Sequence, residues 1–396
     1  GAAQGTWCGR VCEGGTSDTG RKRPDARESG FARCDNLRPV AGAAAPSLTV
    51  DEVLKAIKGF PHGSAGCKSG LKPQHLKDAL VPGYGDEMVR TITEVATLLA
   101  SGKAHPSARE WICCASLTAL SKPDGSLRPI AIGETLRRLV GKALAKDASE
   151  DFQAYFDPVQ VGVGSKGGAE AVVRTVRQYV APNVVIATLD LKNAFNCVDR
   201  SAFRAEIRRV APRLAPWVDF QYGEPTPLFF GDTRLSSERG VQQGDPLGPA
   251  LFAAAIHPTV MEIAGHLREQ GLQELGLKAF YLDDGVLAGP QQSVAVAVDF
   301  VEERLGAIGL SLNRQKCELI PVAGRAHSVL PARFGGFAFR ESGDFKLLEA
   351  AFGSSEYCND QLNKRCVKAK HLLSQIEAMG DAQTALLLAR NCAGFC

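Results

Sequence analysis

The sequence predicts a mixed fold of α-helices and β-sheets, because segments with strand and helix periodicity alternate along it. Val184–Leu189 is an unbroken run of mostly β-branched and apolar residues, which is typical of a buried strand. Asp283-Asp284-Gly285 stands between two short apolar segments, a pattern that predicts a β-hairpin. Apolar residues then recur with a helical period from Val294 to Ile308, and Gly309 follows as a helix stop.

Length and composition are those of an ordinary globular protein. The 396 residues suffice for two or three domains, and 45% hydrophobic with 22% charged residues is a common balance. No run of about 18 apolar residues indicates a transmembrane helix, and residues 1–20 lack the apolar core of a secretory signal, so we expect no membrane contact. Since the chain has no initiator Met and stops at Cys396, we interpret it as a piece of a longer protein.

Basic residues are concentrated in one part of the chain, although the formal net charge is only +3. Between Lys103 and Lys146 there are eight Lys or Arg residues against three Asp or Glu residues. Such a patch attracts phosphate groups. A basic face that is merely solvated has the same composition, and charge alone does not separate the two interpretations.

The 12 cysteines show no disulfide or ligand framework. Cys8 and Cys12, like Cys392 and Cys396, are separated by three residues and have no neighbouring His. None of the cysteines forms the C-x₂-C repeats of a zinc site. We interpret them as reduced thiols that are mostly buried.

The order of elements follows from periodicity and turn residues. Residues 1–46 are rich in Gly, Ala, Arg and Asp without periodicity, so we expect a disordered segment or a linker. The first helix is expected to begin at the capping box Thr49–Glu52, and a strand–turn–strand unit is expected from Ser116 to Ala131. Leu310–Asn313 and Cys317–Ile320 are expected to pair as a hairpin. Further helices are expected at Leu136–Leu144, Gly167–Val180 and Pro249–Leu267.

Carboxylates occur at two places where strands are expected to end. Asp190 follows the strand Val184–Leu189, and Asp283 and Asp284 lie at the hairpin tip. If the two strand ends lie side by side in one sheet, three carboxylates meet there, and such a cluster is costly without cations. Carboxylate oxygens suit Mg²⁺ or Mn²⁺, and two such ions about 3.5–4 Å apart activate an attacking hydroxyl and stabilise a departing phosphate oxygen. Each pattern alone is common in turns and helix caps, so the combination carries the interpretation.

Six motifs in a fixed order resemble the reverse-transcriptase domain of non-LTR (LINE-like) retrotransposons, over roughly residues 50–396. They are Ser64–Leu76, Ser121–Ile130, Leu189–Phe195, Gly240–Pro249, Tyr281–Asp284 and Gly309–Lys316. The resemblance implies an α+β or α/β right-hand polymerase. It places fingers with an N-terminal extension at 47–150, a palm with an antiparallel sheet and part of the fingers at 151–345, and a primer-grip region with the start of a truncated thumb at 346–396.

The resemblance implies roles around the carboxylates. Two Mg²⁺ or Mn²⁺ ions would be bound by the carboxylates of Asp190, Asp283 and Asp284. The backbone carbonyl of Leu191 would be a further ligand. Asp283 matches the stronger ligand of the hairpin pair and Asp284 the lesser one. Tyr281 and Leu282 match positions near the primer end, and Leu282 replaces the Ala that the family often has. Lys316 matches a general acid for the departing pyrophosphate.

Other positions match the binding site for the incoming nucleotide. Lys122 and Arg128 match cations that hold the triphosphate, where Arg offers a planar fork and Lys a point charge. Gln243 and Gly244 match residues under the new base pair and the template. Phe195 matches the residue that faces the sugar, where a bulky ring leaves no room for a 2′ hydroxyl. Surface cations on a hairpin and a core phenylalanine are the alternative interpretations.

One departure from the family lies near the C-terminal end. Phe345–Gly353 falls where the family has its primer-grip segment, and Glu349 replaces the Gly that is normal there. A carboxylate at this point repels the phosphates of a primer. Gln361–Leu388 is expected to form the first helices of the thumb.

The resemblance thus implies an RNA-directed DNA polymerase that binds an RNA template, a DNA primer and dNTPs, inside the cell in the nucleus or cytoplasm. Two other classes stay open: an RNA-dependent RNA polymerase, and a decayed retroelement fragment that binds nucleic acid or nothing. Intact Asp190, Asp283 and Asp284 favour an enzyme, whereas Glu349 favours decay. The sequence carries no signal for the oligomeric state.

Overall fold

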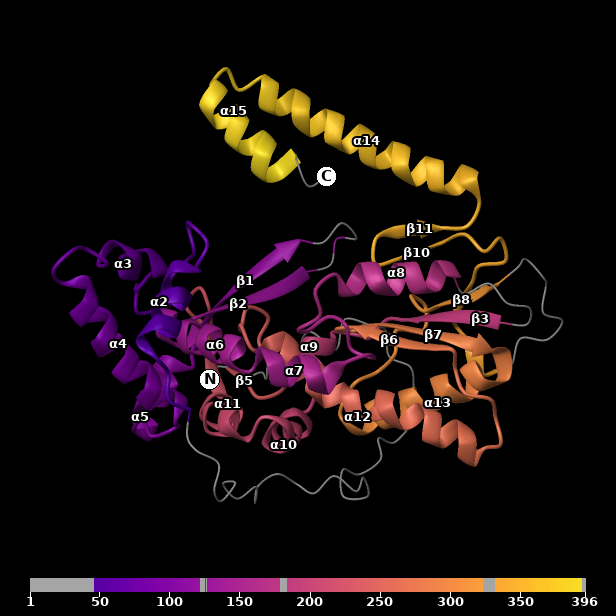
Figure 1. Ribbon diagram of the computed structural model, residues 1–396, viewed down its shortest axis with the longest axis horizontal. Coiled ribbons are helices and arrows are strands. Elements are labelled where there is room, and N and C mark those ends of the chain that lie inside the picture. Colours follow the sequence, from indigo (N-terminus) through magenta and orange to yellow (C-terminus); the bar gives the residue numbers. More distant parts are fainter. Residues whose placement is uncertain (1–45, 122–124, 126, 179–183, 323–331, 394–396) are drawn as a thin grey trace.

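A computed structural model describes residues 46–121, 125, 127–178, 184–322 and 332–393. Two main sheets with helices packed around them form the body of the protein, and a helical C-terminal segment extends along one side (Figure 1). The predicted mixed α/β class is confirmed. The linker expected at residues 1–46 lies outside the described residues except for Pro46.

The larger sheet has five strands in the order β6-β7-β3-β8-β9. Their bounds are Leu277–Tyr281 (β6), Asp284–Pro290 (β7), Val184–Leu189 (β3), Glu318–Pro321 (β8) and Ala338–Phe339 (β9). Neighbouring strands are antiparallel except β8 and β9, which are parallel. The antiparallel sheet that was expected is therefore mixed at one edge, because the chain crosses over between β8 and β9 instead of turning back in a hairpin.

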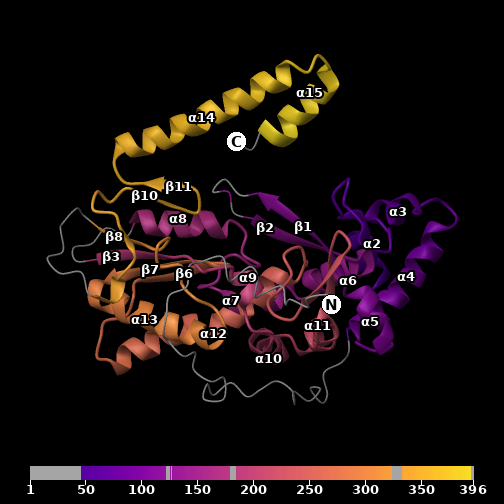
Figure 2. The same cartoon turned by 180° about the vertical axis from the view of Figure 1, so that it is seen from behind.

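Both faces of β3 are covered, which explains its unbroken apolar sequence. Val185 and Ala187 belong to the main core, which they share with helices α12 (Gly248–Glu269) and α13 (Gln291–Ala307). Ile186 belongs to a second core with Val172 of helix α8 (Gly168–Gln178). In Figure 1, α8 lies above the sheet and α12 and α13 lie below it, and Figure 2 shows the same layers from behind.

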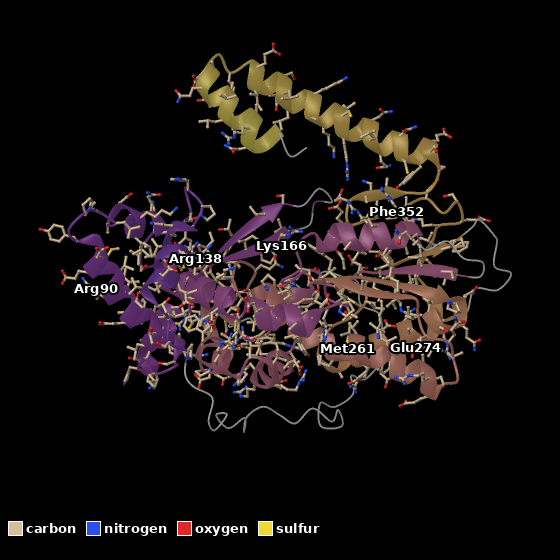
Figure 3. The ribbon with its side chains drawn as sticks, in the orientation of Figure 1. Arg90, Arg138, Lys166, Met261, Glu274 and Phe352 are labelled. Carbon is tan, nitrogen blue, oxygen red and sulfur yellow. The ribbon has the colours of Figure 1, made fainter. Side chains whose placement is uncertain are left out.

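Helix α12 differs from the composition-based expectation, because by length and composition it is apolar enough to cross a membrane. Most of its residues are buried inside the fold, against α13, α10 (Arg200–Val210) and α7 (Ser149–Phe156). Met261 is one of the few α12 side chains that reach the surface (Figure 3). We interpret α12 as the central core helix, whose all-round burial explains its apolar composition.

The smaller sheet has four strands in the order β2-β1-β4-β5. Their bounds are Leu127–Gly133 (β2), Ala115–Ser121 (β1), Thr226–Phe230 (β4) and Thr233–Ser237 (β5). The strand–turn–strand unit predicted at 116–131 is confirmed as the antiparallel pair β1–β2, and most of its turn lies outside the described residues. β4 pairs parallel with β1, so a hairpin from the middle of the chain extends the N-terminal one.

Helices of the N-terminal part pack beside the smaller sheet. They are α2 (Val50–Lys58), α3 (Pro73–Asp78), α4 (Gly85–Ala100), α5 (Pro106–Ile112) and α6 (Thr135–Asp147). The predicted capping box of α2 is confirmed: the Thr49 hydroxyl accepts from the Glu52 N–H, and the Glu52 carboxylate accepts from the Thr49 N–H. Val53 and Ile57 of α2 are buried, and they fix this helix against the core.

Short helices join the two sheets and the C-terminal part completes the chain. The helices between β3 and β4 include α9 (Ala194–Cys197), η2 (Pro212–Leu214) and α11 (Ala215–Tyr222), whereas η3 (Ala332–Phe334) lies between β8 and β9 of the larger sheet. The C-terminal elements are β10 (Phe345–Leu347), β11 (Ala350–Phe352), α14 (Ser355–Glu377), α15 (Ala382–Leu388) and the π-helical turn η4 (Ala389–Ala393). Ile376 is the only buried residue of α14, and the side chains of this helix project outward along most of its length (Figure 3).

The hairpin expected from Leu310–Asn313 and Cys317–Ile320 is wrong. β8 pairs with β3 instead, with Thr188 opposite Glu318. Leu310–Asn313 crosses the end of β3, where Leu312 forms an isolated antiparallel bridge with Leu191. The backbone groups along this side of β3 are buried and need hydrogen-bonding partners, which β8 provides. Leu310 and Leu312 pack into the main core instead.

Candidate active site

The register of the larger sheet brings the three predicted carboxylates together. β3 and β7 pair so that Leu189 lies opposite Gly285. One residue further along, Asp190 follows the end of β3 and lies beside Asp284 at the start of β7. Asp283 precedes Asp284 in the turn that joins β6 to β7. Both other carboxylates act electrostatically on Asp284. Residues far apart in the sequence therefore form one cluster, which we call the carboxylate edge and which consists of Asp190, Asp283 and Asp284.

The charge of this cluster suits divalent cations. Desolvation, followed by the negative charges of Asp283 and Asp190, raises the pKa of Asp284 to about 6. Such repulsion is relieved when a cation is shared between the carboxylates. Hard oxygen donors crowded in this way fit Mg²⁺ or Mn²⁺ better than softer metals.

The turn that carries Asp283 is held by a residue that the sequence did not reveal. Leu282 has a φ of 57°, a left-handed conformation that is unusual for leucine. The Gln160 side-chain oxygen accepts from the Leu282 N–H at 2.9 Å, and the Gln160 amide donates to the Leu282 carbonyl at 3.3 Å. A Cβ atom on Gly162 would lie 2.7 Å from the Leu282 nitrogen, so only glycine permits this close approach. No pattern around Gln160 signals the role.

The backbone at Asp190 is fixed by the segment that follows α13. The Asp190 carbonyl accepts from the Asn313 N–H at 2.8 Å, and its N–H donates to the Cys317 sulfur at 3.4 Å. Lys316 directly precedes Cys317, and its own N–H donates to the Asn313 carbonyl. The structure thus brings Lys316 into the same loop that supports Asp190. Leu191 is buried and bridges Leu312, in hydrogen bonds that use the carbonyls of Asp190 and Ser311.

Phe195 lies in the first turn after β3 and joins the carboxylate edge to a neighbouring loop. Its ring stacks on Phe252 of α12, with centroids 4.6 Å apart, and remains half-buried. Its carbonyl accepts from the Val241 N–H at 2.6 Å. A Cβ atom on Gly240 would lie 2.5 Å from that carbonyl oxygen, which explains the glycine. The loop that begins at Gly240 is therefore fixed to the turn that carries Phe195.

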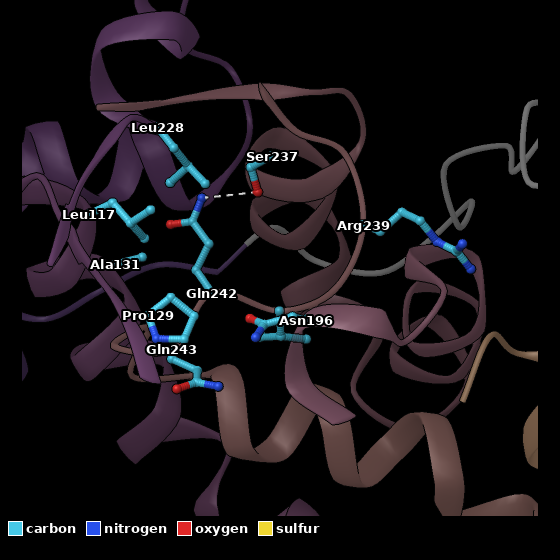
Figure 4. Close-up of a pocket in the computed structure, with 10 residues that line it drawn as sticks. Leu117, Pro129, Ala131, Asn196, Leu228, Ser237, Arg239, Gln242 and Gln243 are labelled. Atoms are coloured by element: carbon cyan, nitrogen blue, oxygen red, sulfur yellow. Dashed lines mark hydrogen bonds between the residues drawn. The ribbon is translucent and has the colours of Figure 1, made fainter. Parts of the chain in front are cut away.

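The same loop contacts the β1–β2 hairpin through Gln243 and Gly244. The Ala131 N–H donates to the Gln243 carbonyl at 2.8 Å, and Gly244, with a φ of 120°, passes close to the Ala131 carbonyl. A small cavity of about 10 Å³ lies beside this contact. In Figure 4 the Gln242 side chain points toward Ser237, whereas Gln243 points to the opposite side. Gln242 is buried and Gln243 is partly exposed, so only Gln243 faces out.

A buried polar network that was not predicted from the sequence supports this loop on its buried side. Tyr222 and Gln221 donate to the Asp245 carboxylate, and Arg137 lies 3.9 Å from it. Arg137, with 2% of its side chain exposed, also donates to the Gln242 side chain at 2.7 Å. Burial and the charge of Asp245 raise the pKa of Tyr222. Asp245 lies within the Gly240–Pro249 motif, and this is the sequence feature that could have indicated the network.

The remaining predicted residues are more peripheral. Arg128 is exposed on β2, opposite Leu120 of β1. Lys122 lies outside the described residues. Tyr281 ends β6 opposite Asp284 and is half-buried. Arg128 thus belongs to the hairpin that contacts the loop of Gln243, and Tyr281 to the hairpin that carries Asp283 and Asp284.

Comparison with known proteins identifies related sequences. The profile of the family described as "Reverse transcriptase (RNA-dependent DNA polymerase)" matches residues 120–339. The 132 kDa protein of the retrotransposable element SLACS from Trypanosoma brucei gambiense is 28% identical over 295 residues, which cover 72% of this chain and 24% of that protein.

Two R2 elements give similar matches. The Pol polyprotein of the type-2 element R2DM from Drosophila melanogaster is 26% identical over 222 residues, 52% of this chain and 21% of that protein. That of the type-1 element R2 from Popillia japonica is 26% identical over 310 residues, 71% of this chain and 40% of that protein. The matched part thus spans less than half the length of each of these relatives.

Proposed function

The chain belongs to the reverse transcriptase (RNA-dependent DNA polymerase) family, and on this premise we propose that it copies an RNA template into DNA by adding deoxynucleotides to a primer. The resemblance to non-LTR retrotransposon proteins that the motifs predicted is confirmed by the matches to SLACS and R2 proteins. The observation that best supports catalysis is the register that sets Asp190 beside Asp284 and Asp283.

The proposed reaction is nucleotidyl transfer. The 3′ hydroxyl of the primer loses its proton to solvent as its oxygen forms a bond to the α-phosphorus of a dNTP, the bond from that phosphorus to the bridging oxygen breaks, and pyrophosphate leaves. Two divalent ions, when bound, lower the pKa of the attacking hydroxyl and offset the charge of the leaving group. Asp190, Asp283 and Asp284 would hold them together with the Leu191 carbonyl. The β-bridge between Leu191 and Leu312 supports the role of the Leu191 carbonyl, because the hydrogen bonds of this bridge use the carbonyls of Asp190 and Ser311 and not that of Leu191.

Other side chains would position the substrates. Gln160 would hold the turn of Leu282, so that Asp283 keeps its orientation. Gln243 and Gly244 would lie under the new base pair, an assignment supported by the outward direction of Gln243 (Figure 4). Lys316 would donate a proton to the departing pyrophosphate, and its place in the loop beside Asp190 supports this.

The sugar and the triphosphate would contact different elements. Phe195 would face the sugar; its half-buried ring, stacked on Phe252, is held in one position. Such a fixed ring excludes a 2′ hydroxyl and offers it no hydrogen bond. Lys122 and Arg128 would hold the triphosphate, and the exposure of Arg128 on β2 supports this. Tyr281 and Leu282 would contact the primer end.

We assign the polymerase subdomains on the same basis. Residues 47–150 would form the fingers, 151–345 the palm with part of the fingers, and 346–396 the primer-grip region and the start of the thumb. The pairing of β4 with β1 supports a contribution of the middle segment to the fingers. The partners would be RNA template, DNA primer and dNTPs, inside the cell.

Glu349 bears on whether the enzyme is active. It has a φ of 66°, in the region that favours the glycine of the family, and lies in the turn between β10 and β11. Arg365 of α14 donates to its carbonyl and lies 3.4 Å from its carboxylate. This exposed pair offsets part of the negative charge that would repel a primer.

Primer extension on an RNA template tests the proposal, with dNTPs and rNTPs supplied in parallel and Mg²⁺ or Mn²⁺ added or chelated. We expect metal-dependent extension with dNTPs. Equal extension with rNTPs would favour an RNA-dependent RNA polymerase. Binding of the primer–template without any extension would favour a non-catalytic nucleic-acid-binding protein.

A further inference from the structure

A second group of side chains that can bind a metal lies beside the smaller sheet. Its members come from three connections between helices and strands, and all three precede the carboxylate edge in the sequence. Cys67 lies in the connection between α2 and α3, Cys114 directly precedes β1, and Glu134 directly precedes α6. Their sulfur and carboxylate oxygen atoms all lie within 4.8 Å of one another. Cysteine spacing does not reveal this group, because its members are joined by the fold and not by a short motif.

We propose that Cys67, Cys114 and Glu134 bind a Zn²⁺ ion through two thiolates and one carboxylate. The two sulfur atoms are 3.9 Å apart, and the Cys114 sulfur is 3.8 Å from the nearer Glu134 oxygen. Tetrahedral zinc, with bonds of about 2.3 Å to sulfur and about 2.0–2.2 Å to oxygen, places such ligand atoms about 3.5–3.8 Å apart. These two pairs need to contract by only a few tenths of an ångström around the ion, and the Cys67 sulfur and the Glu134 carboxylate, which lie within 4.8 Å of each other, need to approach by at most about 1.2 Å.

A fourth ligand for the zinc ion is available close to Cys67. The Ser116 hydroxyl lies 3.5 Å from the Cys67 sulfur, so this hydroxyl or a water molecule would complete the tetrahedron. Sulfur ligands favour zinc over Mg²⁺ or Mn²⁺, the ions that suit the carboxylate edge. The two sites therefore select different metals.

The surroundings of Glu134 call for a cation. Only 6% of this residue is exposed, yet among the described residues its hydrogen-bond partners are neutral: the N–H and hydroxyl of Ser69 and the thiol of Cys114. Its carboxylate does not cap α6, the helix that it precedes. Arg138 acts on this carboxylate through space and does not hydrogen-bond to it, so a cation bound directly to Glu134 would offset much more of the cost of burying its charge.

Charge and proton balance are consistent with zinc. Two thiols lose their protons to solvent when the metal binds, and two thiolates, one carboxylate and Zn²⁺ sum to a charge of −1. The guanidinium of Arg138 interacts electrostatically with both Cys67 and Glu134 and offsets that charge.

Zinc bound here would fix the α2–α3 connection to the start of β1 and of α6. The consequence is structural: the ion would stabilise the N-terminal part of the fold without contacting the substrates. This separates the inference from the proposed polymerase activity, because zinc binding is measured on the chain without template, primer or nucleotide.

The test is zinc stoichiometry of the full 396-residue chain by elemental analysis, for the unaltered protein and for matched alanine variants of two adjacent buried cysteines. We expect Cys114→Ala to carry one zinc ion per chain fewer than the unaltered protein, and Cys113→Ala to carry the same number. The difference between variants isolates this site from any zinc bound by other cysteines. Equal zinc content in all three proteins would overturn the proposal.

Cobalt substitution tests the ligands without relying on a variant. Co²⁺ added to the metal-free chain should give the charge-transfer band of thiolate ligands and the visible bands of a tetrahedral site, and both should be lost in Cys67→Ser and weakened in Glu134→Gln. Zinc should also raise the unfolding temperature of Cys113→Ala but not of Cys67→Ser. A spectrum unchanged by Cys67→Ser, or recovery of a Cys67–Cys114 disulfide from freshly purified protein, would overturn the assignment.

Discussion

Gln160 holds the backbone of Leu282 through both ends of its side-chain amide, as acceptor from the N–H at 2.9 Å and as donor to the carbonyl at 3.3 Å. Leu282 has left-handed backbone geometry and immediately precedes Asp283. Such a conformation is strained for leucine and persists only where the surroundings fix it. A buried glutamine from a distant segment, 1% exposed, therefore sets the direction of a proposed metal ligand.

Replacing Gln160 should impair catalysis more than substrate binding. Gln160→Leu leaves the Leu282 N–H without its partner, which costs about 1–3 kcal/mol. If that cost falls on the catalytic arrangement of Asp283, kcat should fall roughly ten- to a hundred-fold, with little change in affinity for the primer–template. Steady-state primer extension with a parallel binding titration measures both. Gln153→Leu, at an exposed position of α7, is the control and should leave kcat unchanged.

The Arg137–Asp245 pair should contribute mainly to stability. Asp245→Asn removes the charge opposite a buried guanidinium, and loss of one partner of a buried pair costs about 3–5 kcal/mol. The remaining hydrogen bonds of Arg137 to Gln242 and to the Cys113 carbonyl favour the lower end of that range. Urea denaturation of the metal-free chain measures the change. Asp360→Asn, which breaks the exposed pair with Lys364, should cost less than about 1 kcal/mol. Equal effects of the two substitutions would contradict this role.

His257 should make stability depend on pH. Burial in α12, with smaller effects of the positive charges of Arg209 and Lys278, lowers its pKa from 6.5 to about 4, although the negative charge of Glu206 acts in the opposite direction. The unfolded chain then binds a proton more readily than the folded one below pH 6.5, so this contribution to stability is complete above that pH and is lost as the pH falls toward 4. Between pH 7 and pH 5 the loss amounts to about 2 kcal/mol.

The pH effect is measured by comparing urea denaturation of the unaltered chain and His257→Leu at the two pH values. The raised pKa of Asp284 acts in the opposite direction, since a carboxyl that protonates more readily when folded gains stability as the pH falls. That contribution is common to both proteins and cancels in the comparison. The variant should therefore lose about 2 kcal/mol less than the unaltered chain, and identical losses would show that His257 is not responsible.

Phe195 should decide which sugar is accepted. Phe195→Val removes the ring that would stand against a 2′ hydroxyl, so use of rNTPs should rise and discrimination against them should fall by at least about tenfold. The ratio of kcat/KM for dNTP and rNTP on the same template measures it. Phe230→Val, at an exposed position of β4, should leave the ratio unchanged. If the unaltered chain already uses both nucleotides equally, the RNA-polymerase alternative is correct.

Local sequence patterns predicted the strands and helices that build the carboxylate edge. The buried strand Val184–Leu189, the hairpin at Asp283 and the α2 capping box each depend on neighbouring residues, and all three are confirmed. The pairing of Asp190 with Asp284 required β3 and β7 to be neighbours in register, which the sequence alone did not establish. The mistaken hairpin at Leu310–Asn313 had the same origin, because two apolar segments close in sequence were assumed to pair.

Residues that act through tertiary contacts were not predictable. Gln160 has no local pattern, since its function depends on a turn more than a hundred residues away. Arg137 lies in an otherwise ordinary amphipathic helix, and its burial is explained by its tertiary partners Asp245, Gln242 and the Cys113 carbonyl. Cys67, Cys114 and Glu134 come from three separate connections. In each case the sequence contains the residues but not their proximity.

The most direct test of the account is primer extension by Asp283→Asn, an isosteric change that removes one charge from the carboxylate edge. We expect extension to fall by at least about a thousandfold, as for a two-metal site that loses a ligand, with an unfolding temperature and a primer–template affinity no lower than those of the unaltered chain. Asp232→Asn, in the exposed turn between β4 and β5, should retain full activity. If Asp283→Asn extends the primer nearly as fast as the unaltered chain, the carboxylates at this edge of the sheet are not the catalytic site.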